Sequence, residues 1–140
     1  MKKTIISEEN AREQVQVFLD YYEISLEDIK NTEAKNGLDS TLDKLTKQIM
    51  LGKLEVREDG GEIKVTQHLK KPLGESKEIE YHELSGKHKV AMKDKGEKDF
   101  YGRIYAMMGS VSGLGETAIV SLKGTDLSVV ECLGALYLNV

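Results

Sequence analysis

Histidine is the side chain in this 140-residue sequence that most readily binds a metal or moves a proton, so its spacing is the first test for chemistry. The three histidines, His68, His82 and His88, lie 14 and 6 residues apart. None has another histidine or a cysteine within two to four positions, the spacing that a zinc site on a helix or knuckle requires. We therefore expect no metal site and no cofactor.

His82 makes the best case for catalysis, because Glu78 and Glu80 would share its side of a strand in an alternating segment. A small-ligand enzyme that uses His82 with Glu80 is one hypothesis. An exposed imidazole paired across strands accounts for the same residues without any activity, and we favour that interpretation.

Nucleophilic catalysis has no visible carrier. Cys132 is the single cysteine, so it can form neither an internal disulfide nor a CxxC motif. It lies in the apolar run 127–133 without a neighbouring cation to lower its pKa, which predicts a buried, inert thiol. No serine occupies a GxSxG elbow.

The segment Gly113-Leu114-Gly115-Glu116-Thr117-Ala118 has the letters of the dinucleotide fingerprint GxGxxA. That fingerprint must follow a strand at the start of a βαβ unit, whereas this segment follows an expected helix and leaves only 22 residues after Ala118. We interpret it as a flexible corner between two helices.

A basic segment, 87–98, carries five lysines against Asp94 and Glu97. It contains no arginine, the usual bidentate reader of phosphates, and no interleaved aromatic side chain. A solvated face is the favoured interpretation and an acidic protein partner the alternative. With a net charge of −4, the chain offers no general attraction to nucleic acid or to an anionic membrane.

Tyrosine and methionine, the residue types of adaptable binding surfaces, gather shortly after the basic segment. We predict that the partner-binding residues are Tyr101, Tyr105, Met107, Met108 and Leu114. The alternative is a buried helical stripe of Phe100, Ile104, Met108 and Val111, which would leave the two tyrosines exposed.

Charge is distributed unevenly along the chain. Residues 1–100 hold 39 of the 44 charged side chains, and the last 40 residues hold five. A weakly charged, glycine-containing end is expected to be core or contact surface. The N-terminus lacks the pattern of a signal peptide, and no apolar run approaches the roughly 18 residues that span a bilayer, so we expect a cytoplasmic protein.

Hydrophobic periodicity predicts an α+β fold with N-terminal helices, a three-stranded antiparallel meander and C-terminal helices. Helices are expected over 8–23, over 25–35 until Asn36-Gly37 breaks the second one, and over 38–51 with Gly52 after the end. Strands are expected over 54–58, over 63–69 with Pro72 ending the strand, and over 78–84, with a turn at Asp59-Gly60-Gly61. Further helices are expected from Phe100, with Asp99 as cap, around Ala118 to Leu122, and after Thr125 as cap.

These elements divide into residues 1–52, a helical arm or subdomain, and residues 53–140, the meander with the C-terminal helices. One continuous domain is the alternative.

From about residue 63 to 138, the order of short motifs resembles the tail assembly chaperones of long-tailed bacteriophages and prophages. The pieces are Leu69-Lys70-Lys71-Pro72-Leu73, the strand 78–84 running into Ser85-Gly86-Lys87, the lysine-rich connector, and Leu122-Lys123-Gly124-Thr125-Asp126-Leu127 at the start of the last helix. The first 53 residues lie outside the resemblance and are interpreted as an added arm for oligomerisation.

The resemblance implies a protein without enzymatic activity that works in the bacterial cytoplasm. Such chaperones bind the tape measure protein and keep its hydrophobic helices in solution while the tail tube polymerises. The alternative function is a tail-associated structural protein that self-assembles into a ring and buries the same surface between identical subunits.

Overall fold

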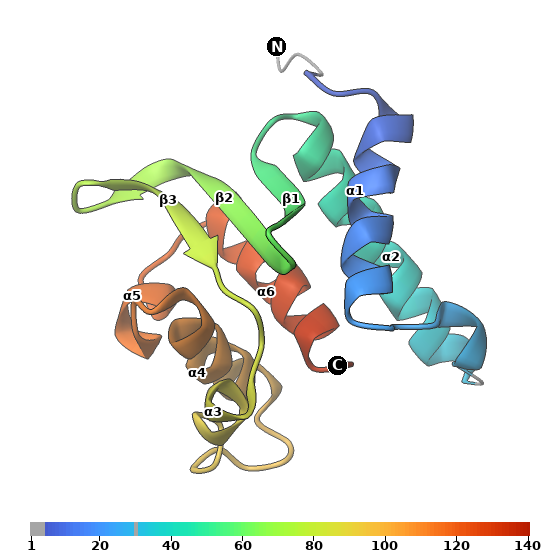
Figure 1. Ribbon diagram of the computed structural model, residues 1–140. Coiled ribbons are helices and arrows are strands. Elements are labelled where there is room, and N and C mark those ends of the chain that lie inside the picture. The colour runs from blue at the N-terminus through green and yellow to red at the C-terminus, as the bar shows by residue number, and fades with distance from the viewer. Residues whose placement is uncertain (1–4, 30) are drawn as a thin grey trace.

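The computed structural model describes residues 5–29 and 31–140, which form helices at both ends of the chain around a three-stranded antiparallel sheet (Figure 1). The predicted α+β class is confirmed. In chain order the elements are α1 (Glu8–Tyr21), the 3-10 turn η1 (Leu26–Asp28), α2 (Thr32–Met50), β1 (Leu54–Asp59), β2 (Glu62–Leu73), β3 (Ser76–Tyr81), α3 (Gly86–Val90), α4 (Phe100–Ser112), α5 (Glu116–Val120) and α6 (Thr125–Tyr137).

Helix α6 lies at the centre of the fold. It packs against α2, α4 and β2, and Figure 1 shows it between the α1–α2 pair and the α4–α5 pair, on one side of the sheet. Its composition fits this place, because a helix that is apolar on most of its circumference has to be buried. The buried apolar side chains of α6 are Val129, Val130, Cys132, Leu133, Leu136 and Tyr137.

Helix α1 begins and ends close to the predicted positions. The hydroxyl of Ser7 accepts a hydrogen bond from the backbone N–H of Asn10 (3.2 Å), which satisfies one of the free donors of the first turn. Its buried stripe, Ala11, Val15, Phe18 and Leu19, faces the core.

The prediction of a helix over 25–35 that breaks at Asn36-Gly37 is wrong. After η1, helix α2 begins with Asn31 as cap, whose side-chain oxygen accepts from the N–H of Ala34 (3.0 Å), and it runs through Gly37 to Met50. Packing of the apolar stripe that starts at Leu38 stabilises one continuous helix that includes the preceding turn. The free energy gained by this packing exceeds the cost of about 1 kcal/mol for one helical glycine. The predicted C-terminal end of this helix is confirmed, because Gly52 follows it with a φ of +73°.

The sheet is the predicted meander in the order β1-β2-β3, with Val56 opposite Val65 and Thr66 opposite Glu80. Gly60 and Gly61 both have positive φ at the β1–β2 turn, the backbone that a tight two-residue hairpin requires. One face is charged and exposed, and the other is buried. The buried face carries Leu54, Val56, Ile63, Val65, Gln67, Ile79 and Tyr81.

A short chain of buried polar groups ties the sheet to α6. The Tyr81 hydroxyl donates to Gln67 Oε1 (2.7 Å), and Gln67 Nε2 donates to the backbone oxygen of Asp126 (2.9 Å). Because each of these groups is paired, the chain can be buried without the penalty of an unsatisfied polar atom.

Strand β2 does not end at Pro72 as predicted but continues to Leu73, and the β2–β3 register shifts between His68 and Leu73. Within that irregular stretch, the backbone N–H groups of Lys70 and Lys71 donate to the carboxylate of Asp126 (2.9 and 3.0 Å). The carboxylate replaces the ladder partners that the shift removes, so the strand is held by a side chain from α6.

The predicted cap at Thr125 is wrong. Gly124 occupies the cap position, no side chain caps the helix, and Thr125 is its first residue. The acidic residue of that first turn, Asp126, is 4% exposed and directed to β2. By contrast, Asp99 caps α4 as predicted and accepts from the N–H of Gly102 (3.0 Å).

One cluster of buried apolar side chains runs through both predicted segments of the chain. Helix α2 packs on α6 and helix α1 packs on β1, where Gln14 Oε1 accepts the N–H of Val56 (2.9 Å). A shared core of this kind fits the alternative of one continuous domain better than an arm set apart.

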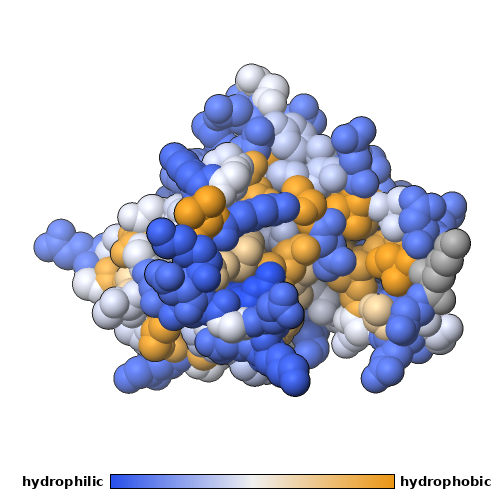
Figure 2. Space-filling model, turned by 90° about the horizontal axis from the view of Figure 1, so that it is seen from below, coloured by the Kyte–Doolittle hydropathy of each residue, from blue (hydrophilic) through white to orange (hydrophobic). Residues whose placement is uncertain are grey.

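Figure 2 shows the molecule from the side of α3 and α4, where hydrophilic side chains predominate and apolar ones emerge in patches between them.

Candidate functional site

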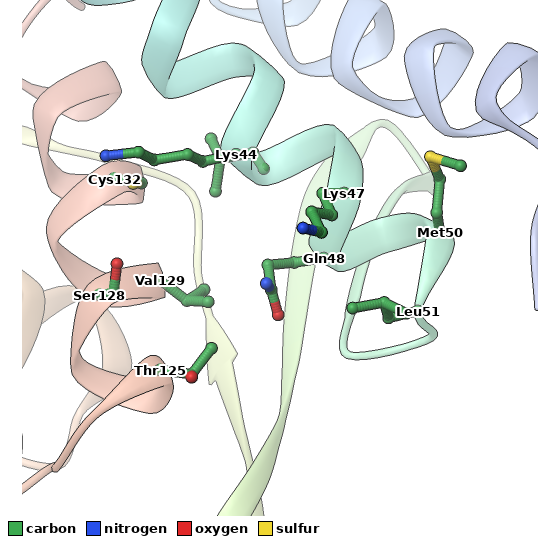
Figure 3. A pocket seen from close by; sticks show the side chains of 10 residues that line it. Lys44, Lys47, Gln48, Met50, Leu51, Thr125, Ser128, Val129 and Cys132 are labelled. Atoms are coloured by element: carbon green, nitrogen blue, oxygen red, sulfur yellow. The ribbon is translucent and has the colours of Figure 1, made fainter. Parts of the chain in front are cut away.

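A hollow lies between α2 and α6, and we call it the α2–α6 groove (Figure 3). It has a volume of about 580 Å³. The residues that line it are Lys44, Leu45, Lys47, Gln48, Met50 and Leu51 from the C-terminal half of α2 and its end, and Thr125, Ser128, Val129 and Cys132 from the first half of α6.

Each wall of the groove repeats the same spacing. Positions 44, 47, 48 and 51 on one side and 125, 128, 129 and 132 on the other are both i, i+3, i+4, i+7 sets. Residues at that spacing form a single face of a helix. The groove is therefore bounded by two helix faces.

The floor of the groove is apolar and its rim is polar. Leu45, Val129 and Cys132 are buried, whereas Ser128 is exposed although it lines the groove. Met50 and Leu51 are half-buried at one end. An unbranched thioether beside a half-buried leucine is an adaptable surface, because methionine can change rotamer to fit different shapes.

The charge in the groove is positive. Lys44 and Lys47 are exposed on its α2 side, neither forms an ion pair with any of residues 5–29 or 31–140, and no carboxylate lines the groove. The acidic residues of α6 are engaged elsewhere, Asp126 by β2 and Glu131 by Tyr105. The two lysines are thus available to an outside partner.

Gln48 adds a polar atom to this site. Its Oε1 is buried and accepts no hydrogen bond from the part of the chain that the structure describes. Figure 3 shows the side chain directed into the space between the two helices. Leaving a buried acceptor unpaired costs about 1–3 kcal/mol. Because the oxygen is closed to solvent, a donor in the groove could pair with it only after the side chain turned.

Cys132 contributes a thiol to the groove. Burial raises the pKa of its thiol, and the opposite effect of the nearby Lys44 is smaller. The thiol therefore stays protonated near neutral pH and adds to the apolar floor.

The predicted partner-binding residues are divided by the structure. Tyr101 and Leu114 are 56% and 42% exposed, whereas Met107 and Met108 are completely buried in the core. The two methionines therefore cannot contact a partner in this conformation, and that part of the prediction needs correction. Helix α4 turns a wide apolar face inward, so both methionines fall within it although they are adjacent in sequence.

Tyr105 is intermediate in exposure between Tyr101 and the two buried methionines. It is half-buried, and its hydroxyl donates to Glu131 Oε2 (2.7 Å). Partial burial and this carboxylate raise the pKa of Tyr105 to about 12. Its ring is stacked on Tyr101, which in turn meets Phe100 edge to face, and we call Phe100, Tyr101 and Tyr105 the aromatic row.

The histidines take three different environments. His82 is exposed, and its side chain makes no hydrogen bond within residues 5–29 and 31–140. The cross-strand pairing predicted for it is formed instead by His68, whose ring lies 3.3 Å from Glu55 Oε2 and 3.4 Å from Glu78 Oε2. His88 is buried beside Ser110 Oγ (2.8 Å), and burial lowers its pKa.

The remaining motifs have structural roles. The first half of the GxGxxA segment, 113–115, forms the turn between α4 and α5, and its second half begins α5. The turn is closed by a hydrogen bond from the N–H of Gly115 to the backbone oxygen of Gly109 (3.0 Å). In the basic segment, Lys95 pairs with Glu116 (2.8 Å), and Lys89 donates to the backbone oxygen of Val140 (2.7 Å). Among residues 5–29 and 31–140 no group of three or more histidine, cysteine or carboxylate side chains is placed to hold a metal ion.

The α2–α6 groove is not evident from the sequence. Lys44, Lys47 and Gln48 look like the solvated side of an amphipathic helix, and Ser128 looks like a polar interruption of α6. The available signal was the occurrence of an i, i+3, i+4, i+7 set of lining residues in each helix, which becomes informative only once α2 and α6 are known to pack together.

No helix in the described ranges 5–29 and 31–140 combines the length and apolarity needed to cross a membrane. No protein-family model, no curated protein and no solved structure matches the chain.

Proposed function

We propose that the protein is a phage or prophage tail assembly chaperone, without enzymatic activity, that acts in the bacterial cytoplasm and binds a hydrophobic helical segment of a tape measure protein. The observation that carries this proposal is the α2–α6 groove, an open, apolar-floored hollow between two helix faces. In helix-in-groove recognition, an amphipathic helix binds with its apolar face in a hollow of this kind.

The dimensions of the groove support a helical ligand. Seven residue steps along each wall correspond to about 10 Å of helix axis, or two turns. A ligand helix presents its anchors at i, i+3, i+4 and i+7 over the same length. The row of side chains on such a helix can pack between the two rows that α2 and α6 present, as ridges pack into grooves in helical proteins.

Two of the motifs that carry the family resemblance are in contact. Lys70 and Lys71, in the charged step before Pro72, donate backbone hydrogen bonds to Asp126 in the last helix. This contact is a structural reason for the two motifs to occur together in one sequence. It also fixes the start of α6, which forms one wall of the groove.

The proposal is tested by affinity capture of the tagged full-length chain from a lysogenic host induced for tail assembly. We expect the captured protein to be the long, helical tape measure protein. Ser128→Trp, which fills the groove from an exposed position, should abolish capture, whereas Ser76→Trp, exposed at the β2–β3 hairpin, should not. Failure of the unmodified chain to capture the tape measure protein would refute the proposal.

The aromatic row favours a second candidate, the self-assembling tail-associated protein. Phe100 and Tyr101 are 47% and 56% exposed, which is unusual for adjacent large aromatic side chains outside an interface. Light scattering distinguishes the two functions. A stable ring that client peptides leave unchanged, and that Phe100→Ser with Tyr101→Ser dissociates, would favour the structural role.

A further inference from the structure

The charge of the α2–α6 groove specifies its ligand more closely than its shape does. Lys44 and Lys47 lie on one rim, three residues apart, and no carboxylate of the groove neutralises them. The floor between them and α6 is formed by Leu45, Val129 and Cys132. An apolar ligand would fill the floor and leave both charges unused.

We propose that the α2–α6 groove takes an amphipathic helix of a partner protein in which the apolar face is flanked by carboxylates one turn apart. The inference rests on the proposed function, because it specifies the client segment that the same groove would bind. Side chains three or four positions apart on a helix share a face, so two such carboxylates reach Lys44 and Lys47 together.

The disposition of acidic residues around the groove supports an acidic partner. Asp126 accepts backbone hydrogen bonds from β2, Glu131 accepts the Tyr105 hydroxyl, and Asp43 lies 3.3 Å from Arg12. Each of these carboxylates is engaged by another group. The hydrogen bonds leave the negative charges of Asp126 and Glu131 in place but turn them toward β2 and Tyr105, whereas the described lining of the groove carries two lysines and no carboxylate. That lining would attract an acidic helix and disfavour a basic one.

Gln48 contributes an amide side chain to the wall of the groove. Its buried Oε1 finds no donor within residues 5–29 and 31–140. Because this oxygen is closed to solvent, a ligand in the groove would reach it only after the Gln48 side chain turned. The α2–α6 groove thus offers two cationic contacts and an apolar floor to one ligand helix.

The test uses two fluorescein-labelled helical peptides of about 18 residues, roughly 27 Å long. Both carry leucines at i, i+3, i+4 and i+7. One carries glutamates on the flanks of that stripe, and the other carries glutamines there, which have nearly equal helix propensity. Binding to the full-length protein is followed by fluorescence anisotropy.

At low salt we expect the glutamate peptide to bind about threefold to tenfold more tightly, the range for two exposed ion pairs. The preference should shrink in roughly 0.5 M salt, where exposed charges are screened. Lys44→Gln with Lys47→Gln should remove the preference, so that the glutamate and glutamine peptides bind this variant equally. Lys35→Gln with Lys77→Gln, a matched pair of exposed lysines outside the groove, should keep it.

The outcomes separate this inference from the proposed function. Equal binding of both peptides to the unmodified protein, blocked by Ser128→Trp, would overturn the acidic preference and leave a groove that binds apolar helices. A preference that survives the Lys44→Gln and Lys47→Gln changes would overturn the assignment of the two lysines. Binding of neither peptide would contradict the proposed function itself.

Discussion

Asp126 shows how much of this fold depends on one side chain. Its carboxylate accepts hydrogen bonds from two consecutive backbone N–H groups of β2 while the residue is 4% exposed. Asp126→Asn keeps the shape but turns one acceptor oxygen into a donor that faces an N–H. We expect a loss of about 1.5–3 kcal/mol in the free energy of unfolding, measured by urea denaturation.

The matched control is Asp94→Asn, at an exposed turn, which should change stability by less than about 0.5 kcal/mol. Equal, small effects of the two substitutions would contradict a structural role for Asp126. The sequence marks Asp126 only as an acidic residue in a first helical turn. Its partner lies 55 residues away, which no local pattern specifies.

His88 provides a pH-dependent prediction. Burial is the main cause that lowers its pKa below the ordinary value, with a smaller effect of Lys87, and Ser110 Oγ lies 2.8 Å from its Nδ1. Because the unfolded chain binds the proton more readily, the unfolded state gains protons first as the pH falls. Stability should therefore be complete above the unfolded pKa of about 6.5 and decrease as the pH falls below it toward the lowered folded pKa.

The measurement compares the free energy of unfolding at about pH 8 and about pH 5.5, on either side of the unfolded pKa. His88→Asn places an amide nitrogen near the position of Nδ1 and removes the titration. It should lose less stability than the unmodified protein over this range. The exposed His82→Asn removes only the smallest of the effects on the pKa of His88 and should stay close to the unmodified protein. Parallel pH profiles of His88→Asn and the unmodified protein would show that His88 contributes nothing to acid sensitivity.

At the scale of elements, replacing a glycine should have opposite effects on stability in α2 and in α4. A Cβ on Gly37 would meet no atom within 4 Å, whereas a Cβ on Gly109 would lie 2.5 Å from the backbone nitrogen of Glu116. Gly37→Ala should stabilise the protein by about 0.5–1 kcal/mol, because alanine is the better helix former. Gly109→Ala should destabilise it by about 1–3 kcal/mol, because α5 would have to move away from α4.

Urea denaturation of both variants checks these opposite signs. A stabilising Gly109→Ala would mean that α5 does not pack closely on α4. The pair also shows where sequence reasoning about elements succeeds and fails. Periodicity located nearly every helix and strand, but a glycine in an open helical position such as Gly37 and a glycine required for close packing such as Gly109 look the same in the sequence.

At the scale of the whole molecule, the sequence predicted the class and the order of elements but not which surfaces meet. Charge distribution drew attention to the last 40 residues, whereas the α2–α6 groove takes half its lining from α2. Met107 and Met108 were expected at a surface because their residue types are adaptable. Only the three-dimensional packing decides that α4 turns both of them into the core.

Phe18 tests whether the chain unfolds as one unit. It is 2% exposed on α1, and its ring meets Tyr137 on α6 edge to face, with centroids 5.3 Å apart. Phe18→Ala removes a core side chain shared by the two ends of the chain and should cost about 3–5 kcal/mol. In one cooperative domain, urea curves from far-UV circular dichroism and from tyrosine fluorescence should shift together and remain superimposable.

If residues 1–52 formed a separate arm, Phe18→Ala would shift only an early transition and leave the unfolding of residues 53–140 in place. The exposed Phe100→Ala is the matched control and should leave both curves close to those of the unmodified protein, because its ring is 47% exposed. Since the α2–α6 groove joins the two parts of the chain, one shared transition would also mean that the groove persists only in the intact fold.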